Sequence, residues 1–514
     1  MCMKLTKKLQ VIECSHMALS IQKKLMDYIL NFVLIAMAFI LSIPSFTYAE
    51  LKTFTKEYKY QASEDDSKLS SRTVSLREVK RLLLEELGTY LESISEVKDF
   101  HLTKDQITTL TAGIVSAEVV EEKWDGKNYW LKAKIAADPA EVIKAIETIR
   151  KDREKTKELE EIRKKADLLL KENELLKQES KTAKGKNKKK KQKEYNSNIK
   201  RLKAIEWVEK GDSFMWSSED YISRRNKAID AYTEAIRIDA TYEDAYRKRG
   251  ETYEWDDPSK ALKDFSKAII LNPNSAINYY KRAQTYHLFL RKYQQAIKDY
   301  TKAIELKPDF AVAFSSRAEV FSLLHDNQQA IKDYTKAIEL TPLQIRDNNQ
   351  YKYDNPYLFY YGRGNAYIEL RNYKQGLKDL NTAIELASQA AKYWKTDYTI
   401  YCNLIYKALA DAYLDLGNYQ QAIKNYDKAI EIHPQEKYYC NRGFAYYNLG
   451  NYKQAIQDFD KAIEIDPTYG WSYYGRGIAY QALGNNIKFI EDLKIAAKLD
   501  HKQARDILRK IGID

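Results

Sequence analysis

Apolar residues follow helical spacing along most of this chain, and strand-like alternation is confined to its first third. The first long helical stripe consists of Leu69, Leu76, Val79, Leu82, Leu83, Leu87, Tyr90 and Leu91. Apolar residues at even spacing occur at Phe54, Tyr58 and Tyr60, and again at Tyr129, Leu131, Ala133 and Ile135, after the turn signal Asp125-Gly126. These patterns predict a small α+β domain over residues 50–148, with the order β-α-α-β-β-α.

The first 49 residues carry the pattern of a secretory signal. Lys23 and Lys24 precede an apolar run from Ile29 to Ile43, and a short polar stretch then leads to Ala49. The run is shorter than the roughly 20 residues that a membrane-spanning helix needs. We expect cleavage after Ala49 and export to the periplasm, the cell envelope or the medium. The alternative is an uncleaved N-terminal helix that anchors the chain.

Residues 149–200 are expected to form a charged helix and a linker. Leu159, Ile162, Ala166, Leu169, Asn173 and Leu176 recur every three or four residues, and both a short coiled coil and a solvated connecting helix fit this spacing. From Lys177 to Lys203 there are 12 basic and 2 acidic residues, and the run Lys188–Lys191 predicts a disordered linker. Contact of the Lys184–Lys193 tract with an anionic envelope surface or an acidic partner is the alternative, and nucleic acid is not expected for an exported chain.

From residue 201 the sequence repeats itself at intervals of about 34 residues. One unit reads Tyr439-x-x-Arg442-Gly443-x-x-Tyr446, then Ala455-x-x-x-Phe459-x-x-Ala462, then Pro467. Small residues recur where two helices must touch, and aromatic residues recur where they interlock. The pattern resembles the tetratricopeptide repeat family, which implies a mainly α fold, an α-solenoid of helix pairs. We expect eight units, numbered one to eight, at 201–241, 242–274, 275–309, 310–343, 357–390, 403–435, 436–469 and 470–502, and a capping helix at 503–514.

Two insertions separate some of these units, at Leu343–Pro356 and at about Ala391–Cys402. They fall between helix pairs, so we expect them to lengthen turns or extend helices without breaking the stack. Cys402 lies at such a junction and Cys440 lies inside the next first helix. Their Cβ atoms need not face each other, and we expect no disulfide between them.

A second periodicity joins arginine and aspartate. Six units carry an Arg before the small residue of the first helix and an Asp in the second helix, as Arg249/Asp264, Arg282/Asp299, Arg317/Asp333, Arg363/Asp379, Arg442/Asp458 and Arg476/Asp492. Unit one has Lys210 and Ala231 instead, and unit six has Leu409 and Asn425. Arg and Asp are present together in six units and absent together in two, which predicts a structural ion pair between the two helices. A carboxylate partly shielded from water is costly unless a guanidinium binds it. The alternative is a basic ladder that binds an acidic ligand.

The first helices of such repeats line a concave face that binds an extended peptide or a partner helix. The candidate groove residues are Tyr280, Tyr361, Asn365, Lys407, Asp411, Phe444, Tyr447, Trp471 and Tyr474. Exposed or inter-repeat packing residues at these positions are the alternative. Units seven and eight bring four aromatic residues of this set together, and aromatic clusters are favoured interface anchors.

The composition supports a mainly helical fold, and the absence of known motifs argues against catalytic, metal and cofactor sites. Gly (17) and Pro (9) are too scarce for a protein of many short strands. The net charge of +12 is concentrated in the signal and the Lys-rich segment. Tyr is abundant, with 41 residues, and most of this excess recurs at four framework positions of the repeats. The sequence contains no GxSxG, P-loop, HExxH, HxxxH or CxxC pattern, so we expect no catalytic, metal or cofactor site.

The α+β domain is similar in pattern to the N-terminal domain of a periplasmic flagellar-ring assembly protein and to a related outer-membrane lipoprotein family. The likeness rests on Gly88-Thr89-Tyr90 at a helix end, on Thr111-Ala112-Gly113-Ile114-Val115 and on the hairpin. The favoured function is an exported, non-catalytic scaffold that binds protein partners through the repeats. A structural component of an envelope or motor-ring assembly and a subunit or regulator of an envelope enzyme are the alternatives.

Overall fold

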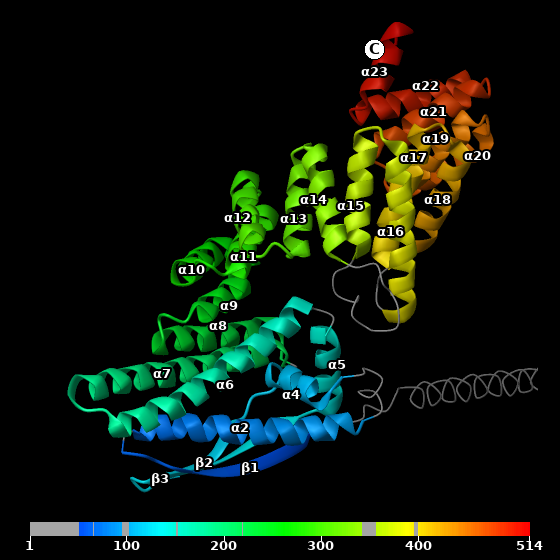
Figure 1. The fold of residues 1–514 in the computed structure, drawn as a ribbon. Helices are drawn as coiled ribbons and strands as arrows, with labels where there is room; N and C mark the ends of the chain where they lie inside the picture. Colours follow the sequence, from blue (N-terminus) through cyan, green and yellow to red (C-terminus); the bar gives the residue numbers. More distant parts are fainter. Residues whose placement is uncertain are drawn as a thin grey trace, which may run out of the picture.

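The structure is a computed structural model that describes residues 51–64, 66–94, 102–150, 153–217, 219–341, 356–394 and 399–513. The predicted signal (1–49) and most of the first insertion lie outside these residues. Figure 1 shows a small α+β domain at one end and a stack of helix pairs that continues to the C-terminus at the other. Within the described part of the chain, no helix combines the length and the hydropathy needed to cross a bilayer.

The α+β domain has the predicted element order. Its elements are β1 (Lys52–Gln61), α2 (Lys68–Glu92), α4 (Lys104–Ala112), β2 (Glu118–Trp124), β3 (Asn128–Ala137) and α5 (Pro139–Arg150). The strands form an antiparallel sheet in the order β1-β3-β2, with Tyr58 opposite Leu131. One face of the sheet is covered by α2 (Figure 1), whose Leu83 and Leu87 are fully buried in the same core as Leu131.

The lysine-rich segment is helical, so the prediction of a disordered linker is wrong. α6 (Arg153–Thr182) and α7 (Gly185–Met215) form a hairpin, which we call the α6–α7 hairpin. Tyr195, Ile199 and Leu202 form a buried stripe on α7 that packs against α6, whereas Lys188, Lys189 and Lys190 on the same helix are exposed. Burial of this stripe stabilises the helix, and the lysines remain in water.

The heptad-like stripe of α6 is covered by the chain itself. Leu159 packs in the core of the α+β domain, and Ile162, Ala166 and Leu176 share a core with α7. Leu169 is partly buried in that second core. The stripe is therefore not the face of a solvated connecting helix, and within this chain its partner is α7.

A buried carboxylate fixes the hairpin to the α+β domain. Asp66 has a fully buried side chain and accepts hydrogen bonds from Tyr60 (2.9 Å), Lys177 (2.9 Å) and Tyr195. Burial raises the pKa of Asp66, but the hydrogen bonds from Tyr195 and Lys177 outweigh it and lower the pKa to about 2. The carboxylate thus joins the β1–α2 connection to both helices of the hairpin.

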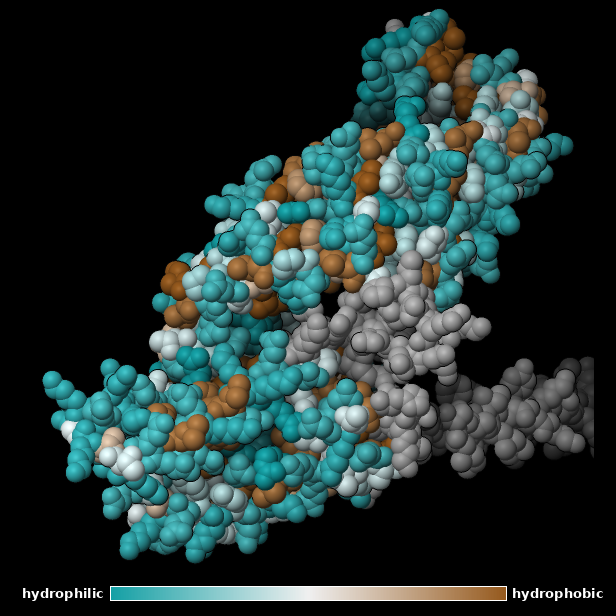
Figure 2. All heavy atoms as spheres, viewed as in Figure 1, coloured by the Kyte–Doolittle hydropathy of each residue, from teal (hydrophilic) through white to brown (hydrophobic). Residues whose placement is uncertain are grey.

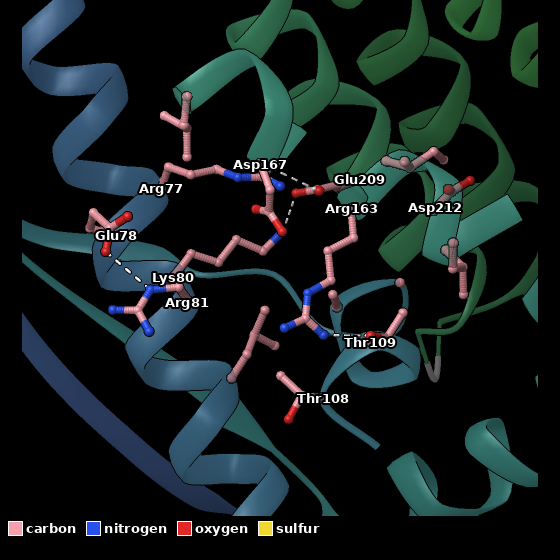
Figure 3. Close-up of a pocket in the computed structure, with 16 residues that line it drawn as sticks. Arg77, Glu78, Lys80, Arg81, Thr108, Thr109, Arg163, Asp167, Glu209 and Asp212 are labelled. Carbon is pink, nitrogen blue, oxygen red and sulfur yellow. Dashed lines mark hydrogen bonds and ion pairs between the residues drawn. The ribbon is translucent and has the colours of Figure 1, made fainter. Parts of the chain in front are cut away.

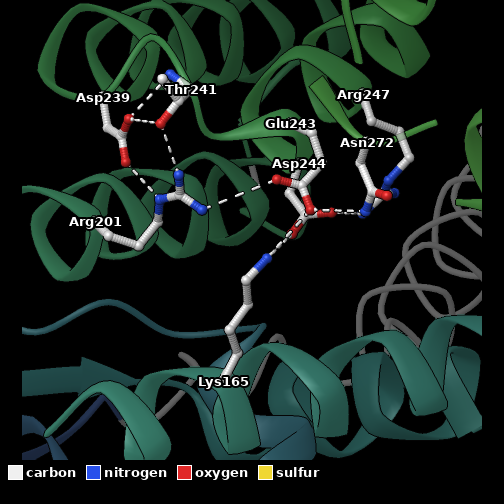
Figure 4. Close-up of polar contacts among 8 residues, drawn as sticks. All are labelled: Lys165, Arg201, Asp239, Thr241, Glu243, Asp244, Arg247 and Asn272. Atoms are coloured by element: carbon white, nitrogen blue, oxygen red, sulfur yellow. Dashed lines mark hydrogen bonds and ion pairs between the residues drawn. The ribbon is translucent and has the colours of Figure 1, made fainter. Parts of the chain in front are cut away.

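On its other side the hairpin holds the start of the repeats. In Figure 4, Lys165 of α6 lies 3.3 Å from both Glu243 and Asp244, and Arg201 of α7 contacts Asp239 and Thr241. α7 is also the first helix of the first helix pair, because its C-terminal part packs on α8 (Tyr221–Ile238). The boundary predicted at residues 200 and 201 falls inside α7, so no loop separates the linker from the repeats.

Eight helix pairs and one further helix follow in the described residues. After α7 and α8, the pairs are α9 (Glu243–Tyr253) and α10 (Pro258–Leu271); α11 (Ala276–Gln284), continued by the π-helix η1 (Thr285–Phe289), and α12 (Tyr293–Leu306); α13 (Ala311–Leu323) and α14 (Asn327–Leu340); α15 (Pro356–Glu369) and α16 (Tyr373–Trp394); α17 (Thr399–Asp415) and α18 (Tyr419–Ile432); α19 (Glu436–Asn448) and α20 (Tyr452–Ile465); α21 (Gly470–Ala482) and α22 (Asn486–Lys498). The last helix, α23 (Lys502–Lys510), packs on α22 at the expected cap position.

Small residues let the helices of each pair approach closely. A Cβ atom at Gly443 would lie 2.9 Å from the ring of Phe459, and one at Gly475 would lie 2.3 Å from the same ring. The absence of both side chains leaves room for one phenyl ring between two consecutive pairs. Cys402 and Cys440 are buried free thiols, as expected from their different settings.

The Asp66 contacts make a testable prediction about the hairpin. Asp66→Ala leaves Lys177 without its buried partner and is expected to lower the free energy of unfolding by about 3 kcal/mol at pH 7. Because the folded pKa is depressed, this stabilisation is complete above about pH 4 and declines as the pH falls toward 2. Urea unfolding of both proteins from pH 7 to pH 3 measures the difference. Asp105→Ala, at an exposed carboxylate on α4, is the matched control, and an equal loss in both variants would contradict the role of Asp66.

Candidate functional site

The first helices of consecutive pairs lie on the inner side of the stack. Among the described elements, α7 contacts α9, α13 contacts α15, α15 contacts α17, and α19 contacts both α17 and α21. In the same part of the chain, second helices of consecutive pairs make no contact of similar extent. Elements that approach more closely on one side of a stack define its concave side. The first helices therefore form the concave face, which is the candidate site.

Aromatic side chains cluster on this face near the C-terminus. Phe444 packs edge-on against Trp471, with ring centroids 6.2 Å apart, and Trp471 packs edge-on against Tyr474 at 6.1 Å. Trp471 keeps 43% of its surface exposed, whereas Phe444 and Tyr474 are half-buried. Tyr447 is also half-buried and packs on Tyr452. We call Phe444, Trp471 and Tyr474 the aromatic cluster.

The capping helix completes this cluster with a histidine. The ring of His501 stacks on Tyr474 and meets Trp471 edge-on, with a centroid distance of 4.4 Å in both cases. His501 is also the N-cap of α23, since its Nδ1 accepts the backbone N–H of Ala504 at 3.2 Å. Burial lowers the pKa of His501, which favours the neutral imidazole. Sequence reasoning missed this residue, although its place directly before the capping helix was a usable signal.

The other predicted groove residues differ in their surroundings. Tyr280 is buried against Tyr300 and Phe310, with ring centroids 5.7 and 4.9 Å away, so it is a packing residue and not an exposed groove residue. Phe310 comes from the next unit and covers it. Tyr361 and Asn365 are half-buried on α15 and remain available on the concave side.

Lys407 and Asp411 bind each other across one turn of α17. Their charged atoms are 2.7 Å apart, and Asp411 also accepts a hydrogen bond from Tyr426 of α18. Burial lowers the pKa of Lys407, but the nearby Asp411 outweighs it and raises the pKa overall. The bond from Tyr426 to Asp411 therefore ties α17 to α18, and the Lys407–Asp411 pair is only partly available to a ligand.

All six predicted Arg–Asp pairs are present in the structure. In each, Nε and Nη2 of the arginine donate to the two carboxylate oxygens at 2.6–3.0 Å, the bidentate geometry of a guanidinium on a carboxylate. The pairs are Arg249 with Asp264, Arg282 with Asp299, Arg317 with Asp333, Arg363 with Asp379, Arg442 with Asp458 and Arg476 with Asp492.

The aspartates of these pairs are buried between the two helices of their unit. Their side chains are only 5–9% exposed, so a ligand on the concave face cannot reach them, and they are not binding-site residues. This holds for every member of the set, namely Asp264, Asp299, Asp333, Asp379, Asp458 and Asp492. For Asp458, burial raises the pKa while Arg442 opposes the increase. A carboxylate withdrawn this far from water needs the guanidinium, which is the reason the two residues occur together.

Each arginine also reaches the preceding unit. Its Nη1 donates at 2.5–3.2 Å to a side chain on the preceding second helix, namely Thr233, Ser266, Thr301, Thr335, Asp427 and Asp460 in chain order. An aromatic ring three residues earlier lies 5.4–5.8 Å from the guanidinium carbon. Because the guanidinium is occupied on all sides, it serves the stack. A basic ladder that binds an acidic ligand does not fit these contacts.

The two units without the Arg–Asp pair share a different polar contact. In unit one, Tyr232 donates to Asp212 at 2.8 Å, and Lys248 lies 3.3 Å from the same carboxylate. In unit six, Tyr426 donates to Asp411 in the same way, but the lysine beside this carboxylate is Lys407 of the same helix, whereas Lys248 belongs to the next unit. Asp212 and Asp411 both directly follow the small residue of the first helix. A tyrosine–aspartate hydrogen bond on the concave side thus replaces the ion pair in these units.

A cavity of about 80 Å³ lies where α2, α4, α6 and α7 meet (Figure 3). Its charged groups mostly bind one another. Glu209 contacts Lys80 at 2.5 Å and Arg77 at 3.1 Å, and Arg163 donates to Thr109. Burial raises the pKa of Glu209, but Lys80 and Arg77 together outweigh it and lower the pKa. The cavity holds a few water molecules at most, and its ion pairs fix the α+β domain to α7.

The molecular surface and the metal-binding groups add two further observations. Figure 2 shows hydrophobic residues in separate patches along the helix pairs, one of them at the C-terminal end.

Among the residues that the structure describes, no group of three His, Cys, Asp or Glu side chains is arranged to hold a metal ion.

Comparison with known families identifies the helix pairs. Sequence models described as tetratricopeptide repeat match residues 276–310, 357–389, 436–469 and 459–488, and one described as TPR repeat matches residues 410–450. The chain carries tetratricopeptide repeats. The matches fall within the predicted units three, five, six, seven and eight, and none reaches the α+β domain. The likeness of that domain to the flagellar-ring assembly protein therefore stays a prediction.

Several solved structures are similar to part of this chain. YrrB, described as a TPR protein with an unusual peptide-binding site, is 22% identical, and the match covers 41% of this chain and 97% of YrrB with a TM-score of 0.32. MamA is 24% identical, over 36% of this chain and 97% of MamA, with a TM-score of 0.30. A tetratricopeptide repeat protein from Parabacteroides merdae is 18% identical, over 57% and 99%, with a TM-score of 0.35. A search of the curated proteins finds no match.

The joint loss of Arg and Asp in unit six supplies a matched test of the ion pair. Arg442→Leu alone leaves Asp458 buried without its guanidinium and is expected to cost about 3 kcal/mol of unfolding free energy. The double variant Arg442→Leu/Asp458→Asn carries the residues found in unit six, Leu409 and Asn425, and is expected to recover at least half of that loss. Urea unfolding measures both. If the double variant is as unstable as the single one, the absence of both residues in unit six is not explained by the ion pair.

Proposed function

We propose that this chain is an exported scaffold that binds a segment of a partner protein on the concave face of its repeats. The observation that supports it best is the aromatic cluster, because Trp471 remains 43% exposed while three rings hold it in place. A large ring fixed by its neighbours loses little conformational freedom on binding, so it is a favourable anchor. Tetratricopeptide repeats bind proteins or peptides, and this cluster is where a segment would gain most apolar contact here.

The rigid joint between the α+β domain and the repeats supports a scaffold role. The α+β domain, the α6–α7 hairpin and unit one share buried ion pairs and a continuous apolar packing. A partner bound by the α+β domain and a segment bound by the repeats would be held at a fixed separation. The charged groups around the cavity in Figure 3 are paired with one another, so that cavity gives no support to catalysis by the α+β domain.

Aromatic truncation tests the binding proposal directly. The chain from residue 50 onward, with Trp471→Ala and Tyr474→Ala, is expected to retain its partner from envelope extract at least about tenfold less than the wild-type chain. Tyr221→Ala removes a similarly exposed ring from the second helix α8 and is the control. Hydrogen exchange of residues 502–510 checks that α23 stays in place. Unchanged retention of the partner in the double variant contradicts the proposed anchor.

Export is tested separately, since it rests on the first 49 residues alone. We expect mass spectrometry of the protein purified from its native cells to give Glu50 as the N-terminal residue, and fractionation to place it outside the cytoplasm. Replacing Leu34 and Ile35 by Asp interrupts the apolar run and is expected to retain the full-length precursor inside the cell. An intact N-terminus together with a cytoplasmic location contradicts export.

A further inference from the structure

The α6–α7 hairpin carries most of the net charge of the chain. Residues 177–203 contain 12 basic and 2 acidic residues, and the first 49 residues carry a further net charge of +3. Together they account for the net charge of +12, so the remaining residues are nearly neutral. The turn of the hairpin lies at the outer edge of the molecule, away from the stack of helix pairs (Figure 1). An anionic surface therefore attracts this protein mainly through the hairpin.

Four lysines line one side of α7. Lys186, Lys189, Lys193 and Lys200 are exposed and follow one another at intervals of three, four and seven residues, which places them along one face of the helix. The buried stripe that begins at Tyr195 occupies the side of α7 that packs against α6. We call the four lysines the lysine face. At a rise of about 1.5 Å per residue, the lysine face is about 21 Å long.

No carboxylate neutralises the lysine face. None of its four lysines forms an ion pair within the described part of the chain, whereas the neighbouring Lys190 and Lys191 contact Glu194 and Glu179. An open depression on this face is lined only by polar side chains, namely those of Lys189, Gln192, Lys193, Asn196, Ser197 and Lys200. The lysine face thus presents ammonium groups and neutral polar groups to the solvent.

The charges of the lysine face weaken the helix that carries them. Lys186 and Lys189 are three positions apart, Lys189 and Lys193 are four positions apart, and like charges at these spacings repel one another. The first turn of α7 has no acidic residue, and positive side chains near a helix N-terminus oppose the helix dipole. The lysines therefore do not serve the fold, and departures of this kind from a favourable local sequence are expected at functional sites.

The use of lysine favours a lipid surface over a ligand of fixed shape. In the repeats, the chain uses arginine wherever a carboxylate is bound in a fixed geometry, as Arg442 binds Asp458 through two nitrogens. A lysine ammonium is a point charge without a fixed geometry, so it suits the mobile headgroups of a bilayer. The open depression has no aromatic ring on which a nucleotide base could stack. A straight row of exposed ammonium groups can instead contact several headgroups at once.

We propose that the lysine face is a docking surface for an anionic lipid bilayer. The proposal goes beyond the proposed function and does not depend on it, because the aromatic cluster lies on units seven and eight. Docking places α7 along the bilayer, with its ammonium groups among the lipid phosphates. Since α7 is also the first helix of unit one, the bilayer then holds the first repeats in one orientation.

Vesicle binding tests this proposal. The chain from residue 50 onward is mixed, at about 150 mM salt, with vesicles of phosphatidylcholine that contain either no phosphatidylglycerol or about one third of it, and bound protein is measured by sedimentation. We expect binding to the anionic vesicles alone. Each lysine near an anionic bilayer strengthens binding about fivefold, so the variant Lys186→Gln/Lys189→Gln/Lys193→Gln/Lys200→Gln is expected to bind at least about 100-fold more weakly.

The control variant removes the same charge from exposed positions on second helices, by Lys298→Gln, Lys332→Gln, Lys424→Gln and Lys453→Gln. It is expected to bind the anionic vesicles as the wild type does. Thermal unfolding checks that both variants are folded, and the lysine-face variant is expected to be at least as stable as the wild type because repulsion within α7 is removed.

Three results would overturn the docking surface. They are no binding to anionic vesicles, equal binding to neutral ones, and an equal loss of binding in the two variants. Retention on immobilised polyglutamate without binding to anionic vesicles also overturns the bilayer as the partner, in favour of an acidic protein. Each of these results leaves the proposed function standing, since that function is tested at the aromatic cluster.

Discussion

The geometry of the repeats depends on one guanidinium–carboxylate pair buried between the two helices of most units. The arginine binds its own aspartate through two nitrogens, reaches the preceding unit through the third and lies over an aromatic ring. Each contact alone contributes modestly in water, but together they fix the rotation of the first helix about its axis. The small residue that follows the arginine then faces the second helix, and the residue after that faces the concave side.

Where this pair is absent, the chain uses a different polar contact. Asp212 and Asp411 occupy the first helix one position beyond the small residue, and a tyrosine from the second helix donates to each. In units with the ion pair, that position holds other residues, for example Phe444 in unit seven and Glu319 in unit four. The ion pair thus removes the need for a fixed aspartate on the concave side and leaves the position free to vary with the ligand. This also accounts for part of the tyrosine excess, because a ring buried between helices carries its hydroxyl to the concave edge.

The sequence predicted the repeats and their ion pairs because both are periodic and each copy reinforces the others. It failed at Lys188–Lys191, where a dense charge run obscured the apolar stripe that begins only at Tyr195 and continues into unit one. Tyr280 was misassigned because its burial depends on Phe310 of the next unit, a contact that no single unit reveals. His501 lies outside the repeat pattern, so the periodicity that located Phe444, Trp471 and Tyr474 did not reach it.

Because α7 belongs to both the hairpin and unit one, it links the folding of these two parts during synthesis. One face of the helix completes a core with α6, and the same helix completes unit one with α8 and α9. The core that α6 and α7 share with unit one is complete only when the chain has been synthesised to about Ala245, so the hairpin does not finish folding before unit one is made. A product that ends near residue 200 would lack Leu202, Ile205 and Val208, which belong to the same core as Ile162 and Ala166 of α6, and this core would stay open to water. Synthesis of unit one is in this way a condition for a closed core in the α6–α7 hairpin.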